Sequence, residues 1–499
     1  MGATDLALVI DAAEARDPDE RFDELHELRE HGELMESTGQ LAFRSARLLA
    51  ASGDPSDLPA VAKLSLRAHE DGVDGAGLIH AEASDKIALY TGRPQLYGTV
   101  MLEHLGDIVQ PPVDKRVSDD ERAALGVPSL AELDRRMHDL SRRLATDRAQ
   151  QVGWLPEGQR FCRVWLDHSP DDLRARMAAE GTSAWADGDV LTFVAESATP
   201  VTVTPVFPIE TWPAGDGLQV LSLRVERLDE AVITYTFTPT AGAPPMSFAR
   251  GSHDGRFRGA NAPDELASNN PLAGSSFEHA VESAALGEPR RVTVYTPPGH
   301  QVGQNLPVIY ATDGNMFAPY GRRLDAAIEN GLCPPVVVVA AHSAGFDPLR
   351  GNLRAAEYLP GFDEGLYNAH QRFFIDELGD WAEAELGVPA DRENRAVWGA
   401  SDGGGHAAMV ARLFPARFGH AFVHSTGMAP DMHTDWGADQ PMMHLCAGTL
   451  EGPFHQATEA WAGYLMLAEA KYHFTERVAG HDLVQWAEEL PRAIQRAWG

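Results

Sequence analysis

The sequence is poor in cysteine and in lysine. Its 499 residues include three cysteines, Cys162, Cys333 and Cys446, whose spacing fits neither a zinc site nor a disulfide framework. Only four lysines are present, and 73 acidic residues give a formal net charge of −32. Because a chain of this sign repels nucleic acid and anionic membrane surfaces, we expect neither as a partner.

Long apolar runs and a basic leader are also lacking. The run VVVVAA, from Val336 to Ala341, is far shorter than the roughly 20 residues that cross a bilayer. The first residues, MGATDLALVIDAAEARD, carry acids where a secretory leader has a basic start and an apolar stretch. With so few cysteines, this pattern predicts a soluble cytoplasmic protein.

Four regions differ in texture, as a chain longer than one ordinary domain suggests. Residues 1–150 place leucines three or four apart among charges, which predicts a mostly helical domain of unknown function. Residues 158–245 hold short alternating runs between turn residues, typical of an Ig-like β-sandwich. Residues 246–285 are rich in Gly, Pro, Asn and Ser and are interpreted as a linker. Residues 286–499 alternate apolar strands with helices, which predicts an α/β domain with a doubly wound, mostly parallel sheet.

Within the helical region, GRPQLYGT at Gly92–Thr99 interrupts the leucine pattern. We interpret it as a structural turn rather than a ligand site. His69, His80 and Asp85 are too irregularly spaced to indicate metal ligands. We expect the protein to need neither a metal nor an organic cofactor.

The stretch VWGASDGGGHAAM contains the most informative motif. Three consecutive glycines are costly in a helix, so they must answer a geometric need. Strand RAVWG runs into Ser401 and a helix follows, which is the strand–turn–helix context that gives G-x-S-x-G its meaning. Gly399 and Gly403 then allow strand and helix to approach closely while Ser401 projects as a nucleophile.

A serine nucleophile needs a base and an acid, which follow it in the chain in this context. His481 lies between the strand YHFTERV and an amphipathic helix, so we expect it to be the base. The rival His406 would point away along its helix. Glu451 follows strand MMHLCAG and is the expected acid, with Asp482 and Glu459 as poorer substitutes.

An oxyanion hole needs two backbone N–H groups. One is expected from Asp402, directly after the serine. The second should come from the loop DGNMFAPYG after strand LPVIYAT, where Asn315 is the first choice and Met316 the second.

From about Arg290 onward the sequence resembles the esterase D / enterochelin esterase branch of the α/β-hydrolases. The resemblance is carried by YATDG, RAAEYLP, FFIDEL, GHDLVQW and the long stretch around GASDGGG. It implies a triad of Ser401, Glu451 and His481. The preceding sandwich is similar in placement to the N-terminal domain of enterochelin esterases, which helps build the substrate pocket.

The resemblance further implies that Arg354 and Glu357 form a salt-bridged pair in the pocket wall, and that His342 contacts substrate. Asp402 departs from the pattern, because relatives often carry a neutral residue there. A carboxylate beside the oxyanion site disfavours charge build-up unless it points away.

We therefore predict a serine-dependent carboxylic ester hydrolase, similar to enterochelin (siderophore) esterases, that works on a small-molecule ester through an acyl-enzyme. Two alternatives stay open: an acyltransferase with the same triad, and a non-catalytic binding or scaffold protein with a relic hydrolase fold. A homo-oligomer is compatible with the sequence.

Overall fold

The structure is a computed structural model, and it divides the chain into two units, Met1–Trp165 and Leu166–Gly499. Among the residues it describes, no helix is long and apolar enough to cross a membrane. The described residues are 10–11, 25–27, 29–30, 32, 34–104, 107–204, 209–239, 255–266, 271–301, 303–347, 351–432, 436–437 and 439–499.

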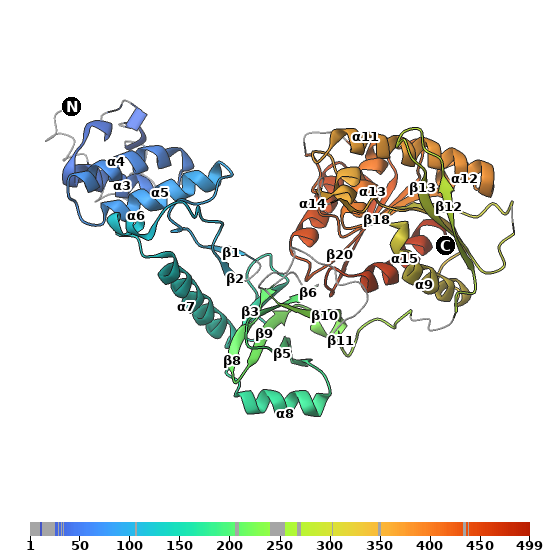
Figure 1. Ribbon diagram of the computed structural model, residues 1–499, viewed down its shortest axis with the longest axis horizontal. Helices are drawn as coiled ribbons and strands as arrows, with labels where there is room; N and C mark the ends of the chain where they lie inside the picture. Colours follow the sequence, from blue (N-terminus) through green and yellow to red (C-terminus); the bar gives the residue numbers. More distant parts are fainter. Residues whose placement is uncertain are drawn as a thin grey trace. The chain divides into compact units, whose positions relative to one another are not determined.

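The first unit is mainly helical, because its apolar residues repeat at helical spacing (Figure 1). Its core includes Leu49, Val61, Leu64 and Ala68, all buried. The main elements are α3 (Gly39–Ala51), α4 (Leu58–Glu70), α5 (Ala76–Tyr90), α6 (Asp119–Ala124) and α7 (Leu130–Ala149), with short strands β1 (Leu102–His104), β2 (Asp107–Val109) and β3 (Phe161–Val164).

The segment Gly92–Thr99 is a turn built around the buried carboxylate of Asp85 on α5. Asp85 accepts hydrogen bonds from the backbone N–H groups of Leu96 (2.6 Å), Tyr97 (2.8 Å) and Thr99 (2.7 Å). These contacts agree with the interpretation of the segment as a structural turn.

The second unit begins with two antiparallel sheets, because its short strands alternate and are separated by turn residues. The rings of Phe193 and Tyr235, one from each sheet, meet edge to face with centroids 5.2 Å apart. One sheet contains β4 (Ala184–Asp187), β5 (Val190–Glu196), β8 (Trp212–Gly215) and β9 (Leu218–Val225). The other has the order β11 (Gly255–Arg258), β10 (Val232–Pro239), β6 (Val201–Thr204) and β7 (Ile209–Glu210). Helix α8 (Pro170–Glu180) packs against the first of these sheets through the buried Leu173.

An eight-stranded sheet follows, and its last six strands in chain order pair in parallel. The strands β12 and β13 join it antiparallel at one edge. The spatial order is β12 (Ser275–Val281), β13 (Arg290–Thr296), β15 (Val337–Ala341), β14 (Val308–Ala311), β18 (Arg395–Ala400), β19 (His420–His424), β20 (Met442–Gly448) and β21 (Tyr472–Arg477).

Residues 246–285, which the sequence predicts to be a linker, contain the strands β11 and β12. Strand β12 has the sequence SSFEHAV and is exposed over most of its length. As an edge strand it is covered by few neighbours, so it lacks the apolar run that marks the buried strands.

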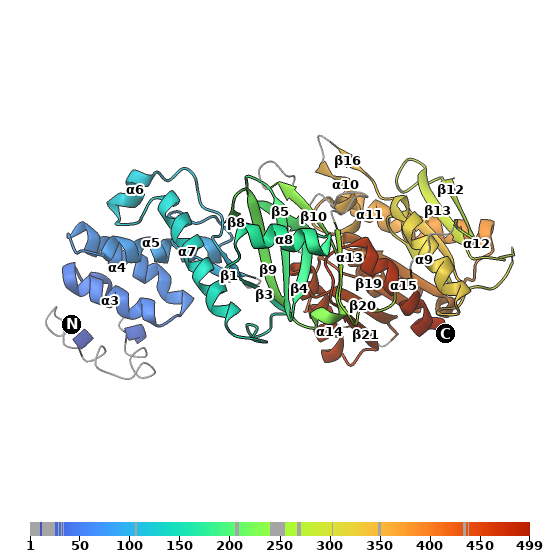
Figure 2. The same ribbon diagram turned by 90° about the horizontal axis from the view of Figure 1, so that it is seen from below.

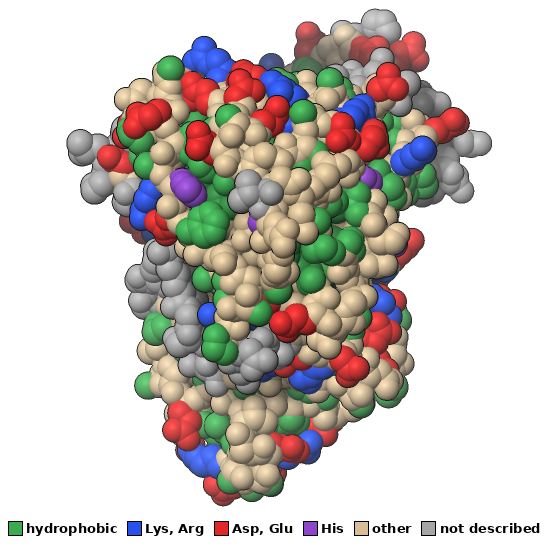
Figure 3. Space-filling model, turned by 90° about the vertical axis from the view of Figure 1, so that its right-hand side faces the viewer, with side chains coloured by type: hydrophobic (Ala, Val, Ile, Leu, Met, Phe, Trp, Pro, Cys, Tyr) green, Lys and Arg blue, Asp and Glu red, His purple; other side chains and the backbone are tan. Residues whose placement is uncertain are grey.

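Helices cover both faces of this sheet (Figures 1 and 2). Along β14, Ile309 and Ala311 join a core with α9 (Ala318–Glu329) and α15 (Leu483–Trp498), whereas Val308 and Tyr310 join the opposite core. That second face holds α11 (Glu364–Arg372), α12 (Leu378–Leu386), α13 (Asp402–Leu413) and α14 (Pro453–Leu467). Acidic side chains are scattered among basic and apolar ones on the face drawn in Figure 3.

Candidate active site

Ser401 occupies the turn between β18 and α13 in a strained backbone conformation, with φ 59° and ψ −128°. The glycines around it are required by close packing. A Cβ on Gly399 would lie 2.0 Å from the carbonyl oxygen of Gly403, and one on Gly404 would lie 2.6 Å from that of His424. The glycine run therefore lets strand and helix meet tightly enough to hold the serine in this turn.

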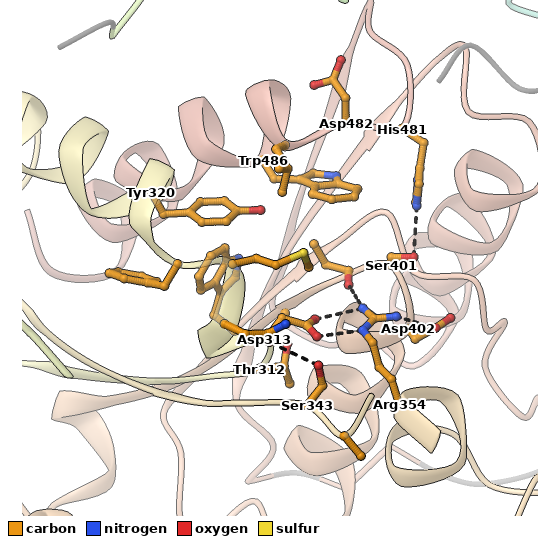
Figure 4. Close-up of a pocket in the computed structure, with 18 of the residues that line it drawn as sticks. Thr312, Asp313, Tyr320, Ser343, Arg354, Ser401, Asp402, His481, Asp482 and Trp486 are labelled. Carbon is orange, nitrogen blue, oxygen red and sulfur yellow. Dashed lines mark hydrogen bonds and ion pairs between the residues drawn. The ribbon is translucent and has the colours of Figure 1, made fainter. Parts of the chain in front are cut away.

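His481 follows β21 and reaches the serine. Its Nε2 lies 3.0 Å from Ser401 Oγ, within hydrogen-bond distance (Figure 4). The imidazole stacks on Phe454, with centroids 3.8 Å apart, and meets the edge of Trp486 at 4.8 Å. These aromatic contacts fix the plane of the ring.

Glu451 follows β20 and lies behind the histidine, with Oε2 3.4 Å from His481 Nδ1. Its other oxygen, Oε1, accepts hydrogen bonds from Ser425 Oγ (2.7 Å), from the Gly448 N–H (3.0 Å) and from Gln485 Nε2. The carboxylate is fully buried. The network aims the free edge of the carboxylate at the imidazole.

Burial dominates the electrostatics of this group. It lowers the pKa of His481, so the imidazole is neutral near pH 7 and its Nε2 is able to accept a proton. Burial also raises the pKa of Glu451, while the hydrogen bonds from Ser425 and Gly448 oppose that rise. These donors favour the ionised carboxylate.

Backbone strain is concentrated at the ends of adjacent strands. Asp313, Ser401 and Ser425 have φ values of 54°, 59° and 49°, and they follow β14, β18 and β19. Non-glycine residues rarely adopt such values, and clusters of them mark sites where side-chain direction is strictly set. The strained positions thus include the serine itself and Ser425, which donates a hydrogen bond to Glu451.

The two candidate oxyanion donors belong to Asp402 and Asn315, which line the same cavity as Ser401. The N–H of Asp402 belongs to the first residue of α13, where helix N–H groups have no partner within the helix. In the loop after β14, Met316 donates its N–H to the carbonyl of Asp313 (2.8 Å). Asn315 lines the cavity and stays the first choice on that side.

The expected ion pair between Arg354 and Glu357 is not formed. Arg354 binds Asp313 through Nε (2.7 Å) and Nη2 (2.9 Å), and binds Asp402 through Nη1. Glu357 instead pairs with the buried Arg290 (2.6 Å). Both residues lie on α10 (Leu353–Tyr358), but Arg354 pairs with aspartates that line the cavity, whereas Glu357 pairs with an arginine on β13.

Two predicted substrate contacts are absent from the described lining of the cavity, which contains neither Glu357 nor His342. His342 is buried and its Nε2 lies 2.8 Å from Thr293 Oγ1. Both positions therefore support neighbouring strands and loops in this structure, and Arg354 is the member of the predicted set that does line the cavity.

The rival base His406 lies on α13, where its ring packs against His370 (4.9 Å between centroids) and Phe374 (4.8 Å). Burial lowers its pKa well below the usual value. His406 therefore packs in the core beneath the turn that holds Ser401, and it does not hydrogen-bond to the serine hydroxyl. Of the substitute acids, Asp482 caps α15 through Val484 (2.8 Å).

A cavity of about 440 Å³ opens at the serine. Ser401 and His481 line it, and Figure 4 shows Arg354 between Asp313 and Asp402. Aromatic side chains form much of the remaining lining: Phe317, Tyr320, Trp398 and Trp486.

Several residues of the site carry no motif. Ser425 and Gln485 hold Glu451, and Phe454 stacks on His481. Their only sequence signal is position, shortly after a strand or at the start of a helix. In the sequence Asp313 belongs to a DG turn signal, which does not indicate its pairing with Arg354.

One group of metal-ligand type lies close together in the described part of the first unit, formed by His26, Asp54 and Asp57. Asp57 there is already bound by Arg29 and Ser52. The group is remote in sequence from the serine site.

The fold and the serine–histidine–carboxylate geometry are consistent with the class of α/β-hydrolases. A family model described as putative esterase matches residues 283–462, which include Ser401 and Glu451 and end before His481. Residues 283–462 are therefore similar to the esterase family, which supports a carboxylic ester hydrolase. No curated protein matches the chain.

Solved structures similar to the chain include three esterases. The enterobactin esterase of Shigella flexneri, determined in the presence of enterobactin, is 19% identical, with 64% of this chain and 97% of that chain covered and a TM-score of 0.48. For the ferric enterobactin esterase of Salmonella typhimurium the values are 18%, 65%, 98% and 0.48. For a ferulic acid esterase of Anaeromyces mucronatus they are 15%, 46%, 92% and 0.39.

Proposed function

We propose that the chain is a serine esterase that hydrolyses a small-molecule ester through an acyl-enzyme. The observation that carries this proposal is the chain of contacts from Ser401 Oγ to His481 Nε2 (3.0 Å), and from His481 Nδ1 to Glu451 (3.4 Å). A neutral, buried imidazole next to a serine hydroxyl is the arrangement that activates the hydroxyl.

In the first half-reaction, His481 accepts the Ser401 proton as Oγ attacks the ester carbonyl. The N–H groups of Asp402 and Asn315 receive the oxyanion. The protonated imidazole then gives its proton to the leaving alcohol, and Glu451 stabilises the imidazolium while it exists. In the second half-reaction, water attacks the acyl-enzyme with His481 again as base, which releases the acid and restores the serine.

The test is hydrolysis of a panel of short p-nitrophenyl esters by the wild type and by Ser401→Ala. We expect the rate of ester hydrolysis to be lower in the variant by a factor of about 10³ or more. A fluorophosphonate should label the wild type but not Ser401→Ala. Ser276→Ala, a change at an exposed serine on β12, is the matched control and should keep the rate. Equal rates in wild type and Ser401→Ala would refute the proposal.

The same experiment separates the alternatives. Addition of an alcohol acceptor would yield transfer product in excess of free acid if the chain were an acyltransferase. A binding protein with a relic fold would show neither a burst of p-nitrophenol nor labelling of Ser401.

A further inference from the structure

The charged side chains that line the cavity are mostly acidic. Among the described lining residues are the carboxylates Asp313, Asp402 and Asp482, and Arg354 is the only one with a guanidinium or ammonium group. His481 adds no charge near pH 7, since burial lowers its pKa. The balance of charge around the nucleophile therefore depends on whether Arg354 is available to a substrate.

Arg354 is fully engaged by two of these carboxylates. It binds both oxygens of Asp313 through Nε and Nη2 and binds Asp402 through Nη1, so each edge of the guanidinium faces an aspartate. The guanidinium carbon Cζ lies over the ring of Tyr358, 5.2 Å from its centroid. An arginine held in this way has no free pair of donors for the bidentate binding of a substrate carboxylate.

Asp402 keeps one side toward the cavity. Its side chain is 24% exposed and that of Arg354 is 20% exposed, and Asp402 directly follows the nucleophile. The cluster of one arginine and two aspartates carries a formal charge of −1, close to the position of the scissile carbonyl. In a partly buried site a charge of this sign raises the energy of a second negative charge.

We propose that Asp402 is a specificity-determining residue, which together with Asp313 occupies Arg354 and disfavours esters that carry a negative charge near the scissile bond. The inference rests on the proposed function of Ser401. The substrate class is an uncharged or positively charged ester whose apolar part packs against the aromatic lining. A polyanionic iron complex would be a poor substrate for the same reason.

The probe is a set of three p-nitrophenyl esters of equal length: adipamate (neutral amide), adipate (carboxylate) and 6-aminohexanoate (ammonium). We expect kcat/KM for the amide to exceed that for the carboxylate by about tenfold or more at low ionic strength. The ammonium ester should be at least as good as the amide. Because salt screens partly exposed charges, the preference should shrink as ionic strength rises from about 20 to about 500 mM.

Asp402→Asn keeps the backbone N–H and frees one edge of Arg354. It should reduce the amide-to-carboxylate ratio by about tenfold, whatever its effect on the overall rate. Asp376→Asn removes an exposed carboxylate elsewhere in the domain and should leave the ratio unchanged. A ratio near one in the wild type, or an unchanged ratio in Asp402→Asn, would overturn the inference.

Failure of this inference and failure of the proposed function give different results. If Ser401→Ala remains active, the proposed function is wrong. If hydrolysis depends on Ser401 but the three esters react equally, only the role of Asp402 is wrong. Should Asp402→Asn not fold, the amide-to-carboxylate ratio of the wild type, measured at low and high ionic strength, still tests the inference.

Discussion

Two buried carboxylates, one in each unit of the chain, have nearly the same exposure and different surroundings. Asp85 is satisfied at both oxygens by the turn it holds: Oδ1 accepts from Leu96 and Tyr97, and Oδ2 accepts from the N–H and the hydroxyl of Thr99. Glu451 accepts hydrogen bonds from Ser425, Gly448 and Gln485 at Oε1, whereas Oε2 faces His481.

The difference separates a structural carboxylate from a functional one. Buried acids are normally satisfied by hydrogen bonds, so burial alone does not distinguish the two. What distinguishes Glu451 is that its remaining oxygen is directed at a titratable ring, which in turn contacts Ser401. Replacing each carboxylate by its amide should therefore have opposite consequences for rate and for stability.

The largest effect is expected for Glu451→Gln. The amide oxygen is able to accept the three donors at Oε1, but its NH₂ group would then face Nδ1 and favour the wrong tautomer of His481. We expect kcat to fall by about 10³ to 10⁴, with a change in the free energy of unfolding of about 1 kcal/mol. Ester hydrolysis and urea unfolding measure the two quantities. A variant with full activity would remove Glu451 from the mechanism.

Asp85→Asn should show the opposite pattern. The NH₂ group of asparagine would face donors of the turn, so at least one buried N–H loses its acceptor. We expect the free energy of unfolding of the first unit to fall by about 2–4 kcal/mol, while kcat per folded molecule stays unchanged.

Glu82→Gln, at an exposed position on the same helix, is the control for Asp85→Asn. It should change neither the urea midpoint nor the rate. If Asp85→Asn instead lowered kcat at unchanged stability, the assignment of Asp85 as a purely structural acid would be wrong.

The pH dependence of hydrolysis should follow His481, the ring that Glu451 faces. Burial lowers the pKa of His481 from its ordinary value of 6.5. Since only the neutral imidazole accepts the serine proton, kcat/KM should persist as the pH falls below 6.5, and should be lost only at the lower pKa of the folded protein. Phe454→Ala admits water to the ring face and should move the acid limb upward by up to about one unit. An acid limb above pH 6.5 in the wild type would contradict this.

Much of the fold after Arg290 could be predicted from the sequence, because strands buried on both faces must be continuously apolar. The runs at Val308–Ala311 and Val337–Ala341 are of this kind. Strand β12 could not be recognised in the same way. Its partners cover it on one edge only, so polar residues are tolerated and the segment resembles a linker.

Within the candidate site, chain order and strand ends indicate from sequence alone which residues lie together, whereas long-range pairing leaves no local signal. Ser401, Glu451 and His481 follow the carboxyl ends of the parallel strands β18, β20 and β21, so topology brings them together. The partners of Arg354 are 41 and 48 residues away, and no local pattern marks them. Glu357, three positions along the same helix, is the partner that the family resemblance implied.

A third carboxylate, Asp482, is intermediate and gives the smallest predicted effect. Its Oδ1 caps α15, and its Oδ2 accepts the hydroxyl of Thr234 from β10 (2.6 Å), directly beside His481. Strand β10 also reaches this loop through the N–H of Val232, which donates to the carbonyl of Val478 (2.9 Å). The antiparallel sheets therefore contact the loop that carries the proposed base.

Thr234→Val keeps the shape of the side chain and removes one hydrogen bond to Asp482. We expect a loss of about 1 kcal/mol in unfolding free energy, and a fall in kcat of about threefold to tenfold with KM little changed, because the loop holds His481 less firmly. Thr238→Val, farther along β10, is the matched control and should keep kcat. If Thr234→Val lowered stability alone, Asp482 would belong with Asp85 as a structural acid, and the contact from β10 would have no part in positioning the histidine.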